Sequence, residues 1–127
     1  MSPRAFANEV IDRWDTIEGA ALGEGAFNPG PAIWAGRREV AHIDFDGALE
    51  IRLTKQQIRA RRDELLADER VTLRASGSEW LEVRVASEAD IAFAMSLVRD
   101  AVAANLPTAE PGPPPTGADL ERRRRFH

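Results

Sequence analysis

A β-hairpin is predicted by one segment, Arg38-Glu-Val-Ala-His-Ile-Asp-Phe-Asp-Gly-Ala-Leu-Glu-Ile-Arg-Leu53. Its turn could be a two-residue turn at Asp46-Gly47 or a three-residue loop from Phe45 to Gly47, and the two differ in register by one residue. Such a change moves every side chain of a strand to the other face of the sheet. The two-residue turn mixes apolar and charged residues on one face, whereas the longer loop separates them. We therefore predict the three-residue loop, with Gly47 in the left-handed conformation.

This register divides the hairpin into an apolar face and a charged face. The apolar face consists of Ala41, Ile43, Leu49, Ile51 and Leu53. The opposite face is predicted to carry Val40, His42, Asp44, Glu50 and Arg52, with His42 directly opposite Glu50.

Composition narrows the possible functions of this 127-residue chain. The net charge of −4 disfavours non-specific attraction to nucleic acid or anionic lipid. The chain contains no Cys and no Tyr, and its two histidines are His42 and His127, so we expect no metal site and no cofactor. The first residues include no apolar run, so we expect a cytoplasmic protein that does not enter a membrane.

Helical periodicity marks three further segments. A first helix is expected to begin at Ser2-Pro3 and to stop near Gly19, with an apolar stripe that includes Val10 and Trp14. A second helix is expected over residues 54–68, and a third from Ser87 to about residue 105. Residues 20–31 are rich in Gly and Pro and are expected to be mainly loop, with a short irregular strand possible over residues 21–27.

Two more strands follow the second helix, and together the elements predict the fold class. Apolar and polar residues alternate over residues 71–74 and 80–85, on either side of a turn at residues 75–78. We expect an α+β two-layer sandwich in the order α-β-β-β-α-β-β-α. Its mainly antiparallel sheet of about five strands would have helices on one face and water on the other.

Residues 1–106 are predicted to form a single domain, followed by a tail over residues 107–127. The tail contains five of the eight prolines and ends in Arg122-Arg-Arg-Arg-Phe-His127. We expect residues 107–117 to be extended or disordered, and residues 119–125 to form at most one helical turn. The aromatic end of the tail could alternatively fold back onto the open face of the sheet.

The open face of the sheet is the predicted site. The second hairpin adds Thr72, Arg74, Trp80, Glu82 and Arg84 to this face. His42 beside Glu50 has the composition of a general base and the carboxylate that orients it, and we take these two as the candidate catalytic residues. The alternative is a solvated cross-strand pair without a catalytic role.

Trp80 is the most unusual residue on a face expected to be polar. Its ring could stack on a planar ligand, lie beside Arg52 or Arg74 in a cation–π contact, or anchor a protein partner. It could alternatively be covered by the loop at residues 20–31 or by the tail. Candidate ligand-binding residues are therefore Arg52, Arg74, Trp80, Glu82 and Arg84.

Three segments give the chain a resemblance to a known family. They are Gly36-Arg-Arg-Glu-Val-Ala-His42, Leu49-Glu-Ile-Arg-Leu53 and Ser76-Gly-Ser-Glu-Trp80. Over roughly residues 4–105 the chain resembles the small bacterial and fungal luciferase domain family, and its layout is more distantly similar to the MmcQ/YjbR-like double-wing proteins. The family name implies light-emitting oxidation. Members tend to carry His where this chain has Asp44, Thr72 and Leu73.

Three hypotheses about function follow. The favoured one is a non-catalytic module that binds a small molecule or a protein on the open sheet face. The alternative is an enzyme, luciferase-like and oxidative or hydrolytic, with His42 as general base. A weak nucleic-acid contact through Arg122–Arg125 is the second alternative, and a homodimer formed through an exposed sheet edge is also possible.

Overall fold

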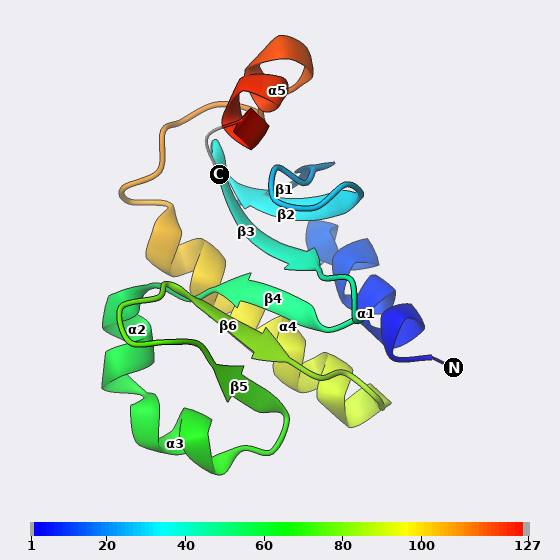
Figure 1. Ribbon diagram of the computed structural model, residues 1–127, viewed down its shortest axis with the longest axis vertical. Coiled ribbons are helices and arrows are strands. Elements are labelled where there is room, and N and C mark those ends of the chain that lie inside the picture. Colours follow the sequence, from blue (N-terminus) through cyan, green and yellow to red (C-terminus); the bar gives the residue numbers. More distant parts are fainter. Residues whose placement is uncertain (1, 126–127) are drawn as a thin grey trace.

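The computed structural model describes residues 2–125, and within them the chain forms one antiparallel sheet of six strands. The strands are β1 (Ala20–Glu24), β2 (Pro31–Ala35), β3 (Arg38–Ile43), β4 (Leu49–Arg52), β5 (Val71–Leu73) and β6 (Trp80–Val83). Their order across the sheet is β1-β2-β3-β4-β6-β5 (Figure 1). The predicted number of about five strands is thus one short, because β1 forms a full strand where mainly loop was expected.

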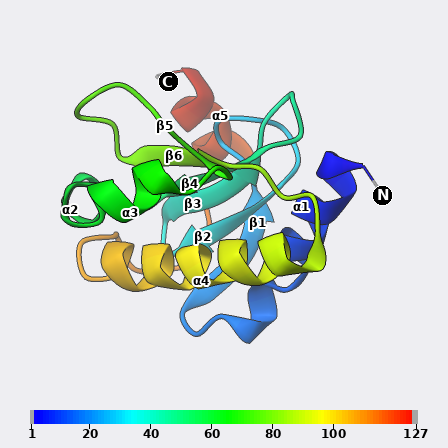
Figure 2. The same ribbon diagram turned by 90° about the horizontal axis from the view of Figure 1, so that it is seen from below.

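The two main helices cover one face of this sheet, as the predicted α+β sandwich requires. They are α1 (Pro3–Asp12) and α4 (Glu88–Asn105), and α4 runs across the sheet while α5 (Gly117–Arg125) lies on the opposite side (Figure 2). A short 3-10 helix, Trp14–Thr16, connects α1 to β1. No helix within residues 2–125 is both long enough and apolar enough to cross a membrane.

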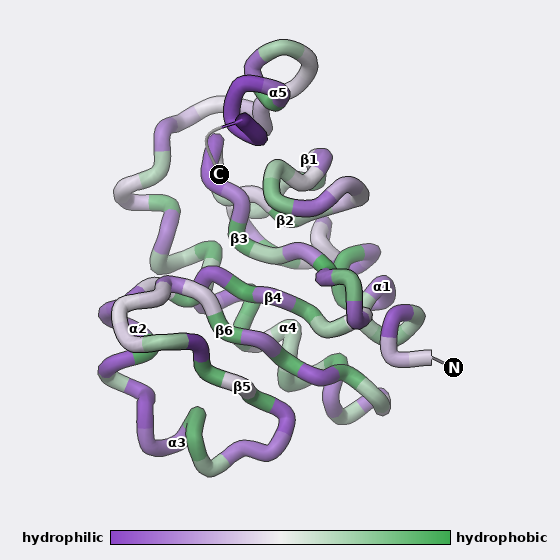
Figure 3. Tube along the Cα trace, viewed as in Figure 1, coloured by the Kyte–Doolittle hydropathy of each residue, from purple (hydrophilic) through white to green (hydrophobic). Residues whose placement is uncertain are grey.

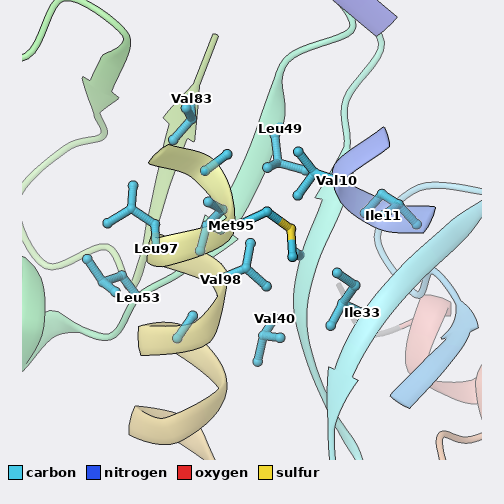
Figure 4. Packing of buried hydrophobic residues seen from close by; sticks show 14 of the residues in the cluster. Val10, Ile11, Ile33, Val40, Leu49, Leu53, Val83, Met95, Leu97 and Val98 are labelled. Atoms are coloured by element: carbon cyan, nitrogen blue, oxygen red, sulfur yellow. The ribbon is translucent and has the colours of Figure 1, made fainter. Parts of the chain in front are cut away.

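The hydrophobic core lies between these helices and the sheet. Its fully buried side chains include Val10, Ile11, Ile33, Val40, Leu49, Leu53, Val83, Leu97 and Val98 (Figure 4). Burying each such side chain contributes roughly 1.5–3 kcal/mol relative to leaving it in water.

The predicted hairpin register is confirmed. Ala41 pairs with Ile51, His42 with Glu50, and Ile43 with Leu49. The loop at residues 45–47 is closed by a hydrogen bond that the Asp44 N–H donates to the Ala48 carbonyl, and Gly47 has a φ of 87°.

The prediction for Val40 is wrong, because β3 contains a bulge. Ile33 pairs with Ala41 and Trp34 pairs with Glu39, which leaves Val40 as an extra residue between the two pairs. A bulge shifts the alternation of side chains by one residue. Val40 consequently lies in the core beside Ile33 (Figure 4), whereas Glu39 lies on the same face as His42.

The predicted second helix is divided in two by a break at Arg61. Its parts are α2 (Lys55–Ala60) and α3 (Arg62–Ala67). The Thr54 hydroxyl caps α2 by accepting a hydrogen bond from the Gln57 N–H at 3.3 Å.

The tail contains no helix or strand over residues 107–116, but it forms a helix of nine residues, α5, where one helical turn was expected over residues 119–125. Its helix α5 is hydrophilic along most of its length (Figure 3), but Leu120 is buried with Ala26, Ala32 and Trp34. The segment before α5 is attached to the turn between β2 and β3, where the Arg37 N–H donates a hydrogen bond of 2.9 Å to the Glu110 carbonyl. The sequence analysis allowed the aromatic end of the tail to fold back onto the sheet. That end is Phe126, which lies outside the described residues.

Candidate functional site

The face of the sheet opposite α1 and α4 is partly covered, although we expected it to be solvated. The loop at residues 25–30 and helix α5 lie over its β1–β2–β3 side, where Trp34 is 1% exposed. His42 is 4% exposed and Glu50 is 7% exposed, so the expectation of an open face around these two residues is wrong. The covering segments are the two that the sequence analysis named as alternative covers for Trp80, namely the loop at residues 20–31 and the tail.

A buried polar network occupies the middle of this covered face. The His42 Nδ1 lies 2.7 Å from Oε2 of Glu39, and its Nε2 lies 3.3 Å from Oε1 of Glu50. The other oxygen of Glu50 forms an ion pair with Arg74, and the other oxygen of Glu39 accepts a hydrogen bond of 2.6 Å from the Ala26 N–H. The network therefore connects strands β3 and β4 to the covering loop and to Arg74.

The geometry around His42 differs at its two ring nitrogens. The contact with Glu50 has the geometry of a hydrogen bond. The contact with Glu39 is shorter, but it does not have the geometry of a hydrogen bond. Both nitrogens nevertheless face a carboxylate.

Aromatic rings cover this network. The Phe27 ring stacks on the His42 ring with centroids 5.7 Å apart, and the Trp80 ring lies 4.9 Å from that of His42. Phe27 and Trp80 meet edge to face at 5.3 Å. The guanidinium of Arg52 lies 4.8 Å from the centre of the Trp80 ring, so the predicted cation–π contact with Arg52 is present. Burial of this guanidinium lowers the pKa of Arg52 below its ordinary value.

A cleft of about 540 Å³ opens beside these rings. Its lining residues are Ala26, Phe27, Asn28, Pro29, His42, Glu50, Arg74, Trp80 and Arg124. Its volume falls within the range of about 300–1,000 Å³ that is typical of small-molecule sites. An aromatic wall with a few charged groups at its edge is also typical of such sites.

A second pair of carboxyl groups lies further along the same face. Asp44 and Glu82 share a hydrogen bond, and this bond, burial and the charge of Asp44 raise the pKa of Glu82. Burial alone would raise the pKa of Asp44, but hydrogen bonds from Glu82 and from the backbone N–H groups of the turn outweigh it and lower that pKa. Arg84 is exposed and lies at this end of the face, with Glu82 and Thr72, in a separate cavity.

The structure thus brings together some predicted site residues and separates others. His42, Glu50, Arg74 and Trp80 line one cleft, and Arg52 supports it from beside Trp80. Glu82 and Arg84 do not line this cleft. Within residues 2–125, no group of three or more His, Asp or Glu side chains is arranged to hold a metal ion.

Three residues of the site were missed by the sequence analysis, namely Glu39, Phe27 and Arg124. Glu39 was not among the candidates, because strict alternation puts Val40 on this face, whereas the bulge puts Glu39 there instead. Phe27 belongs to the Gly- and Pro-rich loop, which was considered only as a possible cover for Trp80. Arg124 was considered only as part of an arginine run that could contact nucleic acid, whereas it donates hydrogen bonds to Glu24 and to the Gly25 carbonyl.

One antiparallel sheet, with α1 and α4 on one face and an aromatic-walled cleft on the other, defines a small α+β domain. The family model described as the luciferase domain matches residues 37–101, which is more than half of the chain. The chain therefore belongs to the luciferase domain family. The matched region includes His42, Glu50 and Trp80 but excludes the loop at residues 25–30 and helix α5. No curated protein and no solved structure matches the chain.

Proposed function

We propose that this protein is a binding module for a small molecule with a flat, apolar or aromatic part, which enters the cleft beside Phe27 and Trp80. The observation that carries the proposal is the meeting of the Phe27, His42 and Trp80 rings at one wall of a 540 Å³ cleft. Stacking on such rings stabilises a planar ligand beyond the area it buries. Arg74 and Arg124 line the same cleft and supply donors that can orient polar groups of the ligand.

The surroundings of His42 support binding over catalysis. A general base needs a ring nitrogen that can accept a proton from the substrate. Here Nδ1 faces Glu39 and Nε2 faces Glu50, so neither nitrogen is directed at the cleft without an intervening carboxylate partner. This arrangement suits a buried network that holds the cleft wall in place.

The alternative is an enzyme of the luciferase-like kind, with His42 as base. It is favoured by one observation, which is that both His42 and Glu50 line the cleft. The two functions differ in what His42→Gln should do. A catalyst would lose turnover while retaining ligand affinity, whereas a binding module has no turnover to lose.

The binding proposal is tested by screening planar heteroaromatic compounds for thermal stabilisation of the protein, followed by titration of the compounds that bind. Trp80→Ala is expected to weaken their binding at least about tenfold, which corresponds to about 1.4 kcal/mol. Phe45→Ala is the matched control, because Phe45 is 86% exposed in the β3–β4 loop. Equal affinities for the two variants would reject this location.

The second alternative, nucleic-acid contact through the arginine run, receives less support. Arg123 donates a hydrogen bond to the Arg37 carbonyl, and Arg124 is paired with Glu24, so two of the four arginines are engaged within the protein. Retention on heparin that disappears when residues 107–127 are deleted would favour this alternative.

A further inference from the structure

A second cavity, on the other side of Trp80, has a basic rim. It has a volume of about 280 Å³ and lies between α2, the start of α3 and the β5–β6 loop, which pass close to one another (Figure 1). It is lined by Lys55, Ile58, Arg59, Arg62, Leu73, Arg74, Ala75, Ser76, Gly77, Ser78 and Trp80. Four of these residues are cationic and none is acidic.

Three of the four cations have no partner among the described residues. Arg74 pairs with Glu50, but no ion pair or side-chain hydrogen bond within residues 2–125 involves Lys55, Arg59 or Arg62. Arg61, which lies between Arg59 and Arg62 in the sequence, contacts both Glu64 and Asp100. This cavity therefore gathers three cations that the described part of the chain leaves unpaired.

Local structure places these cations side by side. Lys55 and Arg59 are four residues apart in α2, so they project from the same side of that helix. Arg62 begins α3 and lines the same cavity. Like charges gathered in this way repel one another, and a bound anion would relieve the repulsion.

The remaining lining residues complete a binding surface. Ile58 and Leu73 are partly buried and pack against the main core, so they form a firm apolar base. Ser76 supplies a hydroxyl group from a turn that is closed by a hydrogen bond from the Ser78 N–H to the Ala75 carbonyl, with Gly77 at a φ of 91°. The Ser78 hydroxyl accepts a hydrogen bond of 3.1 Å from the Trp80 N–H and so fixes the end of this turn.

We propose that this cavity binds a phosphoryl group. A phosphoryl group carries up to two negative charges and three acceptor oxygens, which matches several cations and a hydroxyl better than a single carboxylate does. The cavity lies just below the size range of sites for whole organic ligands, about 300–1,000 Å³, which suits an anionic group. The site uses residues outside the aromatic cleft, apart from Trp80 and Arg74, and does not depend on a ligand in that cleft.

The test is titration of the full chain with inorganic pyrophosphate at low ionic strength, followed by calorimetry and by backbone amide shifts in NMR spectra. Saturable binding is expected, with the largest shifts at Lys55, Gly77 and Ser78. The double variant Arg59→Gln/Arg62→Gln is expected to lose at least about tenfold in affinity, since each lost contact is a charge-assisted hydrogen bond. Physiological salt should weaken the binding further.

Two control variants make the result decisive. Arg99→Gln, at an exposed position of α4, should bind pyrophosphate as the parent protein does. Arg122→Gln tests the arginine run of α5 as a competing site. The proposal is overturned if pyrophosphate does not bind, if Arg122→Gln weakens binding as much as the double variant, or if the amide shifts gather away from residues 55–62 and 74–78. The melting temperature of each variant without pyrophosphate establishes that it is folded.

Discussion

At the scale of single residues, the buried charges of the covered face are its most distinctive feature. Glu39 is 2% exposed and forms contacts with both His42 and the Ala26 N–H. A buried donor that loses its acceptor costs far more free energy than an exposed ion pair contributes. The charges on this face are therefore coupled to the stability of the fold.

Glu39→Ala should lower the free energy of unfolding by about 3 kcal/mol, because it leaves two buried nitrogen atoms without the oxygens that face them. Urea unfolding followed by circular dichroism measures the change. Glu9→Ala is the control, since its ion pair with Arg13 is 42–43% exposed and should contribute at most about 1 kcal/mol. A similar loss in both variants would contradict the role assigned to Glu39.

Glu82 should give the protein a distinct dependence on pH. Its pKa is raised in the folded state by its hydrogen bond with Asp44 and by burial. The folded protein therefore binds this proton more tightly than the unfolded chain. The stabilisation that this bound proton of Glu82 provides is fully present below the ordinary pKa range of Glu, roughly pH 4. It is lost as the pH rises through the raised pKa. Asp44 has a lowered pKa, so its contribution is lost only as the pH falls through that value.

Glu82→Gln retains a hydrogen-bond donor toward Asp44 at every pH. The variant should therefore not show the loss of stability that the parent protein shows as the pH rises toward 7. The free energy of unfolding of the variant, measured in urea from pH 4 to pH 7.5, should rise relative to the parent protein as the pH increases. Glu18→Gln, at an exposed position, should leave the pH profile unchanged. If the free energies of unfolding of Glu82→Gln and of the parent protein change with pH in parallel, the proton between Asp44 and Glu82 does not contribute to stability.

At the scale of elements, the hairpin shows what the sequence could and could not reveal. Its register was predictable because one alternative grouped five apolar side chains on a single face. The bulge at Val40 was not, because two apolar residues in succession are compatible with unbroken alternation as well as with a bulge. The error moved Val40 to the wrong face and hid Glu39, the closest charged partner of His42.

Val40→Thr tests the bulge directly. If Val40 faces the core, the new hydroxyl is buried without a partner, and the free energy of unfolding should fall by about 1 to 3 kcal/mol. Val71→Thr, on the partly buried edge strand β5, should cost less. Denaturant unfolding of both variants measures the difference, and a neutral Val40→Thr would indicate that the strand alternates without interruption.

At the scale of the whole molecule, segments distant in the sequence enclose the site. The loop at residues 25–30 and helix α5 come together over the sheet through Ala26 and Leu120. Neither segment has the periodicity of a buried element, since one is rich in Gly and Pro and the other in Arg. Their cover depends on tertiary contacts by a few side chains, which is why the sequence predicted an open face and a free tail.

Leu120→Ala should detach α5 from Trp34 and expose the backbone around Ala26. We expect a loss of about 2 to 3 kcal/mol and faster amide hydrogen exchange at residues 24–27, measured by mass spectrometry. Leu66→Ala is the control, because Leu66 is 57% exposed on α3. Unchanged exchange at residues 24–27 would mean that α5 does not hold the loop in place.

The ligand cleft itself is tested most directly by the indole N–H resonances of the tryptophans in NMR spectra, recorded while planar heteroaromatic compounds are added. Trp80 lines the cleft, whereas Trp14 packs against the core behind the sheet. Compounds that bind should shift the Trp80 resonance in proportion to occupancy and leave that of Trp14 unchanged. Binding that leaves the Trp80 resonance in place would contradict a ligand site on this face.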